Sequence, residues 1–304
     1  MNTSGISAPA LQRNVPLAAF TTLGIGGRAN YFSEPINEGQ LRELLRWAKQ
    51  EGVPFFVLGN GSNLIFDDAG YQGLVISMRR FAHDLIKVDL DSCRVTVSAG
   101  VSLSRLVRFC QESGLAGTEF LAHIPGTVGG ALIMNAGFSR YVGQQNAIGD
   151  LVEEVRALTR EGDVIHRGRE ELKFSYRHSN LADLIVLDAT LRLWRRSKDQ
   201  ICNEMQANLD FRKSRQNVQE PNAGSIFKNP PSPHAAASYL IENAGLKGKR
   251  IGGIQISEQH ANYFVNKGGA TSADVLLLIE EVQKVLFHAT GITLEPEIRI
   301  VPKN

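Results

Sequence analysis

Glycine is concentrated in a few short segments of this chain, and one of them constrains the fold more than any other feature. Residues 123–137 contain four glycines and one proline in fifteen positions. A tight turn seldom needs so many glycines. A loop beside a helix N-terminus does need them when a phosphate must approach the backbone closely and meet several N–H groups at once. The segment therefore predicts an anion-binding loop, with a plain tight turn as the alternative.

A second glycine-rich turn, residues 59–63, follows the apolar segment 55–58, which has the composition of a short strand. Two loops of this kind favour a ligand that carries a diphosphate. The usual dinucleotide fingerprint is missing, because Gly24, Gly26 and Gly27 form an incomplete G-x-G-x-x-G pattern and follow no evident strand. The sequence thus disfavours an ordinary Rossmann domain.

The composition indicates a folded protein of about two domains, since the chain has 304 residues and a domain has roughly 150. Hydrophobic residues make up 43% and charged residues 21%, which excludes a disordered chain. A net charge of +2 excludes a surface devoted mainly to nucleic acid. No stretch approaches the ~20 apolar residues of a membrane span, and residues 1–20 lack the long apolar core of a secretory signal. We therefore expect no membrane insertion.

The cysteines and histidines give no sign of a disulfide or metal site. Cys93, Cys110 and Cys202 are widely spaced and form no C-x-x-C pair. The seven histidines show no H-E-x-x-H or other close ligand spacing, so no metal is expected. Cys110 falls on the apolar face of an expected helix and is predicted to be a core residue. A reducing cytoplasm is the simplest location for such a chain.

Local signals predict three capped helices. Asn37 and Ser102 are expected to cap the first two, and Thr271 forms a capping box with Asp274 at the start of the third, which Gly291 should end. The ranges 185–193 and 292–301 are expected to be strands.

A further helix is predicted by the spacing of Ile201, Met205 and Leu209. It leads to Arg212, Lys213 and Arg215, a density of cations that suits either a phosphate or a solvated helix end. A domain boundary is expected near residue 196.

Two further segments carry groups that suit acid–base chemistry. Ser225 precedes Lys228 and Asn229 in a compact turn, where its hydroxyl is either a proton donor or an ordinary turn residue. Strand alternation places Glu295 and Glu297 on one face of the last strand, either as functional carboxylates or as a solvated surface. The G-x-S-x-G elbow is missing, so nothing supports a hydrolase triad.

Taken together, the motifs resemble the UDP-N-acetylenolpyruvoylglucosamine reductases, flavoproteins of peptidoglycan precursor synthesis, over nearly the whole chain. No long insertion separates Pro230 from Leu240, so the chain resembles the shorter of the family's two types, which lacks an extra substrate-capping loop. The matching segments follow in family order: NVPL (14–17), TTLGIGG (21–27), LGNGSNL (58–64), IPGTVGGA (124–131), FSYR (174–177), AGSIFKNP (223–230), LIENAGLKG (240–248), SEQHAN (257–262), AT (270–271) and LEPEIR (294–299).

The resemblance implies an α+β fold. It consists of an FAD-binding domain of the vanillyl-alcohol-oxidase type over residues 1–195, with two subdomains divided near residues 80–90, and a substrate-binding domain over residues 196–304. The last strand, 292–301, would return toward the flavin. FAD would be held without a covalent bond. The expected flavin contacts are Gly59, Asn60, Gly61, Ser62, Asn63, Leu64, Ile124, Pro125, Gly126, Thr127, Gly129, Gly130, Asn135 and Gly137.

The implied reaction passes a hydride from NADPH to FAD and then to the enolpyruvyl group of UDP-N-acetylglucosamine enolpyruvate, giving UDP-N-acetylmuramate. By resemblance Arg177 and Glu297 stabilise the charge that develops on the substrate, and Ser225 donates the completing proton. Glu295 keeps a structural role. The expected substrate contacts are Tyr176, Arg212, Lys228 and Asn229. Besides the substrate and NADPH, no nucleic acid and no obligatory protein partner is expected.

The chain departs from the family pattern at several positions. Asn217 replaces a common proline, Asn222 replaces a common serine, and His123 occupies a position that is usually small. The stretch 138–147 is longer than the usual turn, so flavin contacts are not transferred to it. Two other functions remain open from the sequence: a related FAD-dependent hydroxy-acid oxidase or dehydrogenase, and a flavin-binding module without catalysis.

Overall fold

The computed structural model describes residues 11–138, 140, 146–216, 219–231 and 236–303. The chain divides into two compact units, each assembled from segments far apart in sequence. The first unit comprises Met1–Gln12, Tyr31–Asn60 and Gly73–Asp210, and the second comprises Arg13–Asn30, Gly61–Gln72 and Phe211–Asn304. The predicted domain ranges 1–195 and 196–304 stay a prediction.

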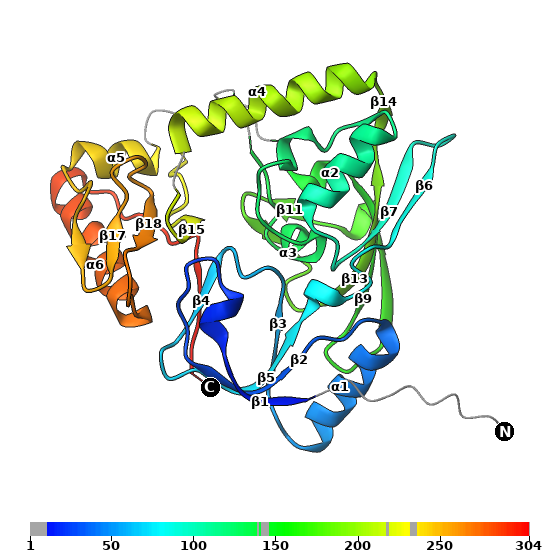
Figure 1. Cartoon of the computed structure of the whole chain (residues 1–304), viewed down its shortest axis with the longest axis horizontal. Helices are drawn as coiled ribbons and strands as arrows, with labels where there is room; N and C mark the ends of the chain where they lie inside the picture. Colours follow the sequence, from blue (N-terminus) through cyan, green and yellow to red (C-terminus); the bar gives the residue numbers. More distant parts are fainter. Residues whose placement is uncertain (1–10, 139, 141–145, 217–218, 232–235, 304) are drawn as a thin grey trace. The chain divides into compact units, whose positions relative to one another are not determined.

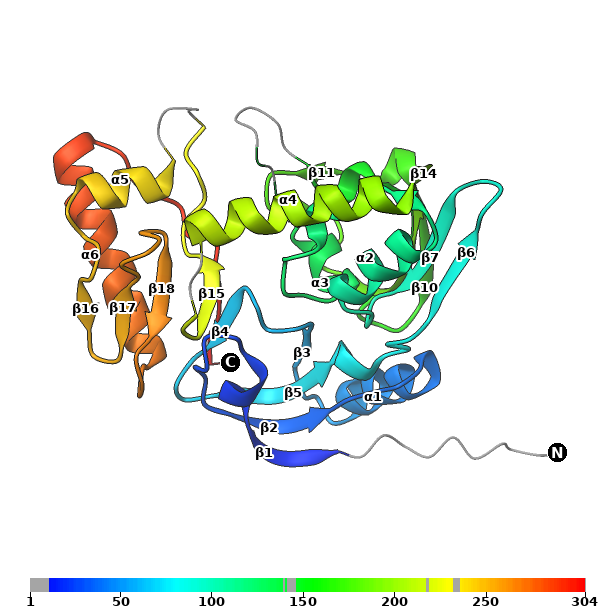
Figure 2. The same cartoon turned by 45° about the horizontal axis from the view of Figure 1, so that its top comes forward.

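The first unit is built on a five-stranded antiparallel sheet with the order β10-β9-β13-β7-β6 (Figures 1 and 2). Its strands are β6 (Ile86–Asp89), β7 (Arg94–Ser98), β9 (Val152–Leu158), β10 (Val164–Gly168) and β13 (Ile185–Arg192). The helix α3 (Val128–Ile133) packs against β7 and β13. The strand predicted at residues 185–193 is confirmed as β13.

Two longer helices of this unit begin at the expected caps. The Oδ1 atom of Asn37 accepts a hydrogen bond from the Gln40 amide at the start of α1 (Glu38–Gln50). The Ser102 hydroxyl accepts one from the Arg105 amide at the start of α2 (Leu103–Glu112). The short elements of the unit are η2 (Met78–Arg80), β8 (Leu115–Ala116), η3 (Glu119–Leu121), η4 (Ile148–Asp150), η5 (Arg169–Glu171), β11 (Phe174–Ser175), β12 (His178–Ser179) and β14 (Trp194–Arg195).

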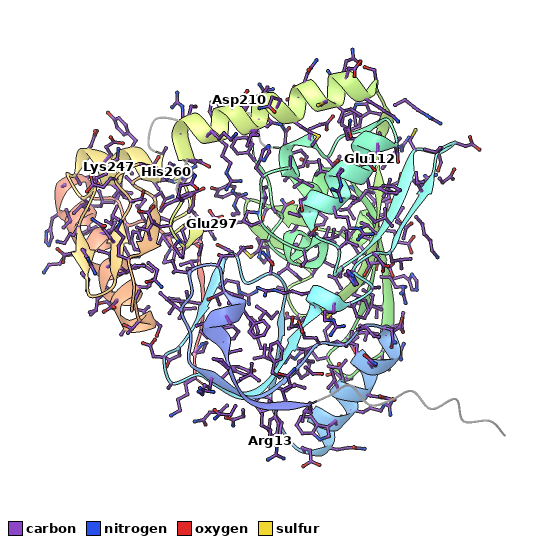
Figure 3. The ribbon with its side chains drawn as sticks, viewed as in Figure 1. Arg13, Glu112, Asp210, Lys247, His260 and Glu297 are labelled. Carbon is purple, nitrogen blue, oxygen red and sulfur yellow. The ribbon has the colours of Figure 1, made fainter. Side chains whose placement is uncertain are left out.

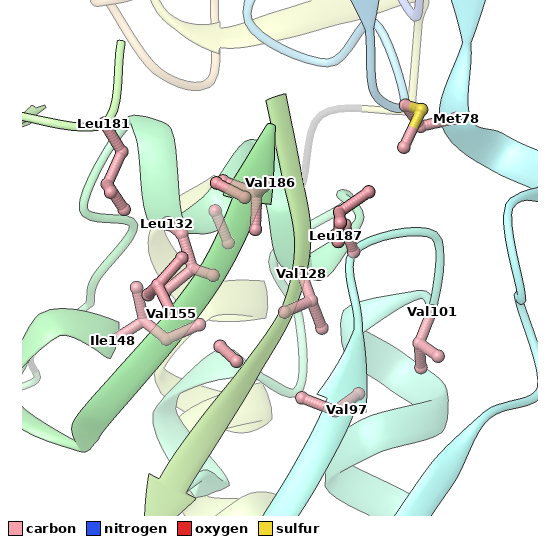
Figure 4. Close-up of a cluster of buried hydrophobic side chains, with 14 of the residues drawn as sticks. Met78, Val97, Val101, Val128, Leu132, Ile148, Val155, Leu181, Val186 and Leu187 are labelled. Atoms are coloured by element: carbon pink, nitrogen blue, oxygen red, sulfur yellow. The ribbon is translucent and has the colours of Figure 1, made fainter. Parts of the chain in front are cut away.

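The hydrophobic core of the first unit lies between the sheet and these helices (Figure 4). Val97 and Val155 from the strands meet Val128 and Leu132 of α3 in this cluster. Cys110 is fully buried in it, as predicted. The core therefore fixes α3 on the sheet. This helix lies inside the glycine-rich segment 123–137, so residues 128–133 of the predicted loop are helical, and the loop proper ends at the N-cap Thr127.

A second sheet has the order β1-β2-β5-β3, and the chain passes from one unit to the other inside β1 (Gln12–Pro16), β2 (Arg28–Ser33) and β5 (Tyr71–Ser77). Within the first unit β3 (Phe55–Leu58) pairs in parallel with β5, from Phe55 opposite Leu74 to Leu58 opposite Ser77. Both strands end at the same edge, so the segments that follow them leave the sheet side by side.

The second unit contains a four-stranded sheet with the order β15-β18-β17-β16, packed against α6 (Ser272–Thr290). The Thr271/Asp274 capping box and the left-handed Gly291 bound this helix as predicted. The other elements are η1 (Leu17–Phe20), β4 (Leu64–Phe66), β15 (Asn222–Ser225), α5 (Ala237–Asn243), β16 (Arg250–Ile251), β17 (Ile254–Ile256), β18 (Tyr263–Asn266) and β19 (Arg299–Val301), which pairs in parallel with β4.

The predicted strand at residues 292–301 is shorter in the structure. Only Arg299–Val301 forms a strand, and Pro296 makes a single bridge to Phe227. Pro296 lacks an amide donor, and the amides of Glu297 and Ile298 both donate to the Ile226 carbonyl, so no regular ladder forms here. The same alternation places Ile292, Leu294, Ile298 and Ile300 on the face opposite the two glutamates; Leu294 and Ile298 are buried, and Ile292 and Ile300 are partly buried.

The helix predicted from residue 201 onward is present as α4 (Lys198–Gln216). It contains the division between the two units, after Asp210. Among the described residues, no helix is long and apolar enough to cross a membrane.

Candidate functional site

The two glycine-rich loops that the sequence singles out meet inside the first unit. Gly59 follows the last paired residue of β3, and a Cβ atom at this position would lie 2.9 Å from the Thr127 hydroxyl and 3.7 Å from the Gly130 Cα atom. Thr127 is the N-cap of α3 and accepts a hydrogen bond from the Gly130 amide. Gly59 is therefore required by the close approach of one loop to the other.

The sequence analysis expected the glycines of the second loop to expose their N–H groups to a phosphate, but Gly129 has a different role. The amides of Val128 and Gly129 donate to the carbonyls of Val101 and Ala99, both at 2.9 Å. A Cβ atom on Gly129 would lie 2.9 Å from the Ala99 Cβ atom. Gly129 is thus needed for packing of α3 on the strand end, and its amide already has a protein acceptor. The flavin contacts predicted for this loop, Ile124, Pro125, Gly126, Thr127, Gly129 and Gly130, stay predictions.

In the turn of residues 59–63, three backbone carbonyl oxygens accept hydrogen bonds from other parts of the protein. Within the first unit, the Nη2 atom of Arg79 donates to the Asn60 carbonyl at 2.8 Å. Within the second unit, the Thr22 amide donates to the Gly61 carbonyl at 3.0 Å and the Arg299 amide donates to the Asn63 carbonyl at 3.0 Å. In a trans peptide the N–H points opposite to the C=O. The N–H groups that follow Asn60 and Gly61 therefore point away from these donors, as an anion-binding turn requires.

Gly61 cannot be replaced without moving this turn. Its φ is +65°, and a Cβ atom there would lie 2.0 Å from the Phe20 carbonyl oxygen. Among the other predicted flavin contacts, Leu64 begins β4 and pairs with Arg299. The turn is thus fixed by steric contact and by backbone hydrogen bonds.

The second unit brings the segments of Ser225 and Glu297 together. Ser225 ends β15 and pairs with Tyr263 of β18. The next residue, Ile226, accepts hydrogen bonds through its carbonyl from the amides of Glu297 (2.7 Å) and Ile298 (3.3 Å). Glu297, labelled in Figure 3, is half-buried, as is Ser225. Two residues predicted to act together therefore lie on adjacent backbone segments.

Two asparagines fix these segments. The side chain of Asn262, 3% exposed, accepts from the Phe227 amide at 2.9 Å and donates to the Phe227 carbonyl at 2.8 Å. Asn63 of the glycine turn donates through Nδ2 to the Glu297 carbonyl at 3.1 Å. Sequence reasoning missed the role of Asn262, although it falls in the segment 257–262 that carried the resemblance.

Arg177 stands at the tip of a hairpin in the first unit, with β11 and β12 on either side. Its φ is +55°, a left-handed conformation that costs a bulky residue roughly 1–2 kcal/mol. Strain of this kind is found where function requires a particular side-chain position. The guanidinium lies 4.9 Å from the centre of the Tyr176 ring, and Nη2 approaches the Gly137 carbonyl at 3.4 Å.

Asn135 anchors this hairpin. It is 7% exposed, and its side chain donates to the Ser175 carbonyl at 2.9 Å and accepts from the Gly149 amide at 3.0 Å. The Ser179 hydroxyl adds a bond of 2.9 Å to the Ile133 carbonyl, at the end of α3. Asn135 and Gly137, predicted as flavin contacts, thus lie in the support of Arg177, and a flavin contact of either residue stays a prediction.

The predicted substrate contacts of the second unit have protein partners of their own. Lys228 forms an ion pair with Glu295 at 2.6 Å, with the Glu295 side chain 70% exposed. This position agrees with the structural role expected for Glu295. Asn229 accepts a hydrogen bond from the Ala237 amide at the first residue of α5. Arg212 lies near the end of α4.

His260 is a partly buried titratable group of the second unit. Burial lowers its pKa to about 4, and the positive charges of Lys247 and Arg212 act in the same direction while Glu242 opposes them. Its ring lies 4.5 Å from that of Tyr263, the strand partner of Ser225. His260 and Lys247 are labelled in Figure 3. A neutral imidazole is therefore expected here at pH 7.

A hollow of about 630 Å³ lies elsewhere, over the polar face of the five-stranded sheet. Its lining includes Arg94, Glu153 and Thr190, and Arg94 pairs with Glu153 across the strands at 2.5 Å. Because these charges are already paired and open to solvent, the hollow has the character of a solvated sheet face. Among the described residues no cluster of three or more metal-ligating side chains occurs.

Some positions noted in the sequence fall outside the described residues. Asn217 is one of them, as are residue 139 and residues 141–145 of the long stretch 138–147. Asn222 is described: its Oδ1 atom accepts from the Gly224 amide at 2.9 Å, which bends the chain just before Ser225. The Nε2 atom of His123 lies 3.3 Å from the Met205 carbonyl.

Comparisons with known proteins show the family of the chain. Residues 29–168 match a family described as an FAD binding domain, and residues 216–301 match the C-terminal domain of UDP-N-acetylenolpyruvoylglucosamine reductase. The chain is 42% identical over 290 residues to the UDP-N-acetylenolpyruvoylglucosamine reductase of Geobacter metallireducens, covering 95% of this chain and 93% of the relative. It is also 42% identical over 293 residues to that of Lactobacillus delbrueckii subsp. bulgaricus, covering 96% and 95%.

A solved structure agrees as well. The crystal structure of UDP-N-acetylenolpyruvylglucosamine reductase from Thermus caldophilus is 36% identical and superposes with a TM-score of 0.80 over 97% of this chain and 100% of the other. The fold is α+β, with an FAD-binding domain and the family's own C-terminal domain. On these matches, the chain belongs to the UDP-N-acetylenolpyruvoylglucosamine reductase family.

Proposed function

We propose that the chain reduces UDP-N-acetylglucosamine enolpyruvate to UDP-N-acetylmuramate with NADPH, and that Ser225, Glu297 and Arg177 carry out the protein's part of the chemistry. The observation that carries the assignment of residues is the fixed backbone around Ser225 and Glu297. Asn262 holds Phe227 on one side and Asn63 holds Glu297 on the other. The proteins of this family are FAD-dependent oxidoreductases of peptidoglycan precursor synthesis, and the chain's place in the family supports the reaction.

The residues of the glycine turn fit FAD. Gly59 has no room for a Cβ atom beside Thr127, and the carbonyl of Asn60 is held by Arg79, so the turn presents N–H groups on its other side. Such a turn suits a diphosphate. FAD supplies the two-electron carrier between NADPH and the enolpyruvyl group, and we propose that it is held without a covalent bond through residues 59–64 and 124–130.

Side chains of the protein are proposed to bind the substrate, stabilise its developing charge and donate the proton. The substrate carboxylate matches the planar guanidinium of Arg177, which the hairpin holds in place at the cost of backbone strain. We propose that Glu297, together with Arg177, polarises and stabilises the enolate-like state of the substrate. The Ser225 hydroxyl gives its proton to the carbon next to the new C–H bond, which completes the lactyl ether. Tyr176, Arg212, Lys228 and Asn229 are proposed to contact the sugar nucleotide.

The location follows from the substrates. NADPH and nucleotide sugars are compounds of the cytoplasm, and we place the reaction there.

Replacement of Ser225 tests these roles directly. In Ser225→Ala the reduction of the flavin by NADPH should stay nearly unchanged, whereas reoxidation of the reduced flavin by the enolpyruvyl substrate should slow severely. Ser225→Cys keeps an ionisable proton donor and should restore part of the rate. Both half-reactions are measured by anaerobic stopped-flow absorbance of the flavin. An equal loss in the two half-reactions would exclude Ser225 as the proton donor.

A further inference from the structure

Arg79 lies next to the glycine turn because of the strand register. The parallel pair β3 and β5 ends with Leu58 opposite Ser77. Asn60 lies two residues after Leu58 and Arg79 two residues after Ser77, so the two residues lie near each other at the same edge of the sheet. The Nη2 atom of Arg79 donates to the Asn60 carbonyl at 2.8 Å. Both residues belong to the first unit.

The backbone of Arg79 is held rigidly. It forms the middle of η2, whose first residue, Met78, is buried in the core. A Cβ atom at Gly100 would lie 2.0 Å from the Phe81 carbonyl oxygen and 2.6 Å from that of Met78, so the strand end at Gly100 packs directly on this turn. The Ser98 hydroxyl also donates to the Phe81 carbonyl at 3.1 Å. The guanidinium therefore extends from a fixed base.

The guanidinium is partly buried and lies in the field of one carboxylate. Burial lowers the pKa of Arg79, and the negative charge of Glu34 opposes that shift. Glu34 is itself held by the Ser77 hydroxyl at 2.9 Å. An arginine stays protonated under these conditions. The turn thus receives a charged hydrogen-bond donor from inside the protein, which is a stronger donor to a carbonyl than a neutral group.

We infer that Arg79 is a positioning residue for the flavin diphosphate, acting through the Asn60–Gly61 peptide. The peptide is planar and trans, so fixing the Asn60 carbonyl toward the guanidinium turns the Gly61 N–H to the opposite side. That N–H is the donor that an approaching diphosphate meets. Arg79 thereby sets the direction of the Gly61 N–H. The charge of Arg79 also adds positive potential beside the turn.

The inference rests on FAD binding at the glycine turn and is independent of the roles proposed for Ser225, Glu297 and Arg177. Loss of a charge-assisted hydrogen bond to the turn should weaken FAD binding about tenfold to hundredfold, equivalent to about 1.4–2.8 kcal/mol. Because the residue acts on binding and contacts no reacting atom, kcat at saturating FAD should change little.

The experiment titrates the flavin-free protein with FAD and follows flavin fluorescence. Arg79→Ala should raise the FAD Kd by the factor above, and Arg79→Lys, which keeps a positive donor, should give an intermediate Kd. The matched control is Arg80→Ala, because Arg80 is the exposed neighbour in the same turn and should bind FAD like the wild type. Thermal unfolding of each flavin-free variant reports whether the fold is intact.

The outcomes separate the possibilities. An Arg79→Ala protein that melts like Arg80→Ala and binds FAD weakly supports the inference. Wild-type FAD affinity in Arg79→Ala would overturn it. If Arg79→Ala does not fold, Arg79→Lys decides: a raised Kd with an unchanged melting temperature supports the positioning role, and an unchanged Kd overturns it. Failure of the wild type to bind FAD would instead contradict FAD binding as such.

Discussion

Replacing Asn135 should loosen the hairpin that carries Arg177. The buried side chain makes two hydrogen bonds, to Ser175 and Gly149, and its φ of +44° is one that asparagine tolerates better than alanine does. We expect about 2 kcal/mol from the two hydrogen bonds and about 1 kcal/mol from the strain of alanine at this φ. Asn135→Ala should therefore lose about 3 kcal/mol of stability, and Asn135→Gly, which removes the strain, about 2 kcal/mol.

The two variants are a matched pair, because they differ in backbone strain and share the loss of the side-chain bonds. With an unfolding entropy of about 2.1 cal/mol/K per residue, a loss of about 3 kcal/mol lowers the melting temperature of this 304-residue chain by roughly 5 °C. Thermal unfolding of the flavin-free protein measures this. FAD titration and stopped-flow reoxidation then show whether binding or catalysis suffers, and we expect the larger loss in reoxidation by substrate. Unchanged stability together with a large loss of FAD affinity would refute the reasoning and make Asn135 a direct flavin contact.

Two further predictions follow from burial. Because the pKa of His260 is lowered to about 4 from an ordinary 6.5, the unfolded chain binds its proton more strongly between these values. The free energy of unfolding should fall by up to about 3 kcal/mol as the pH drops from 6.5 to 4, and His260→Gln should flatten this dependence in urea titrations at several pH values; an identical slope in the variant would contradict the assignment. Burial raises the pKa of Cys110 to about 12, so iodoacetamide at pH 8 should label the exposed Cys202 and leave Cys110 unmodified until urea is added. Modification of Cys110 in the native protein, mapped by mass spectrometry, would show that its site opens.

The sequence could predict what depends on neighbouring residues. The caps Asn37, Ser102 and Thr271 act within three residues of themselves, and all three were predicted and confirmed. The strand at residues 292–301 was predicted too long, because its extent depends on what it pairs with. Leu294 and Ile298, which the alternation places opposite the glutamates, are buried, but the amide of Glu297 bonds to the Ile226 carbonyl, about seventy residues away.

The candidate site shows the same limit. The glycine segments pointed to Gly59 and Thr127, and the structure brings these two residues together. No local signal showed that the Gly129 amide donates to Ala99, since this bond forms only when α3 packs on the strand end. The supporting residues Arg79, Asn135 and Asn262 act on backbone groups from 14 to 40 residues away, and such pairs become visible only in the fold.

The most direct test of the account is the complete cycle of the flavin in the wild-type protein. The purified protein is reduced with NADPH under anaerobic conditions, UDP-N-acetylglucosamine enolpyruvate is added, and the absorbance of the oxidised flavin is followed. We predict rapid recovery of the oxidised spectrum with formation of UDP-N-acetylmuramate. A flavin that is reduced by NADPH and stays reduced after the substrate is added would contradict the proposed reaction.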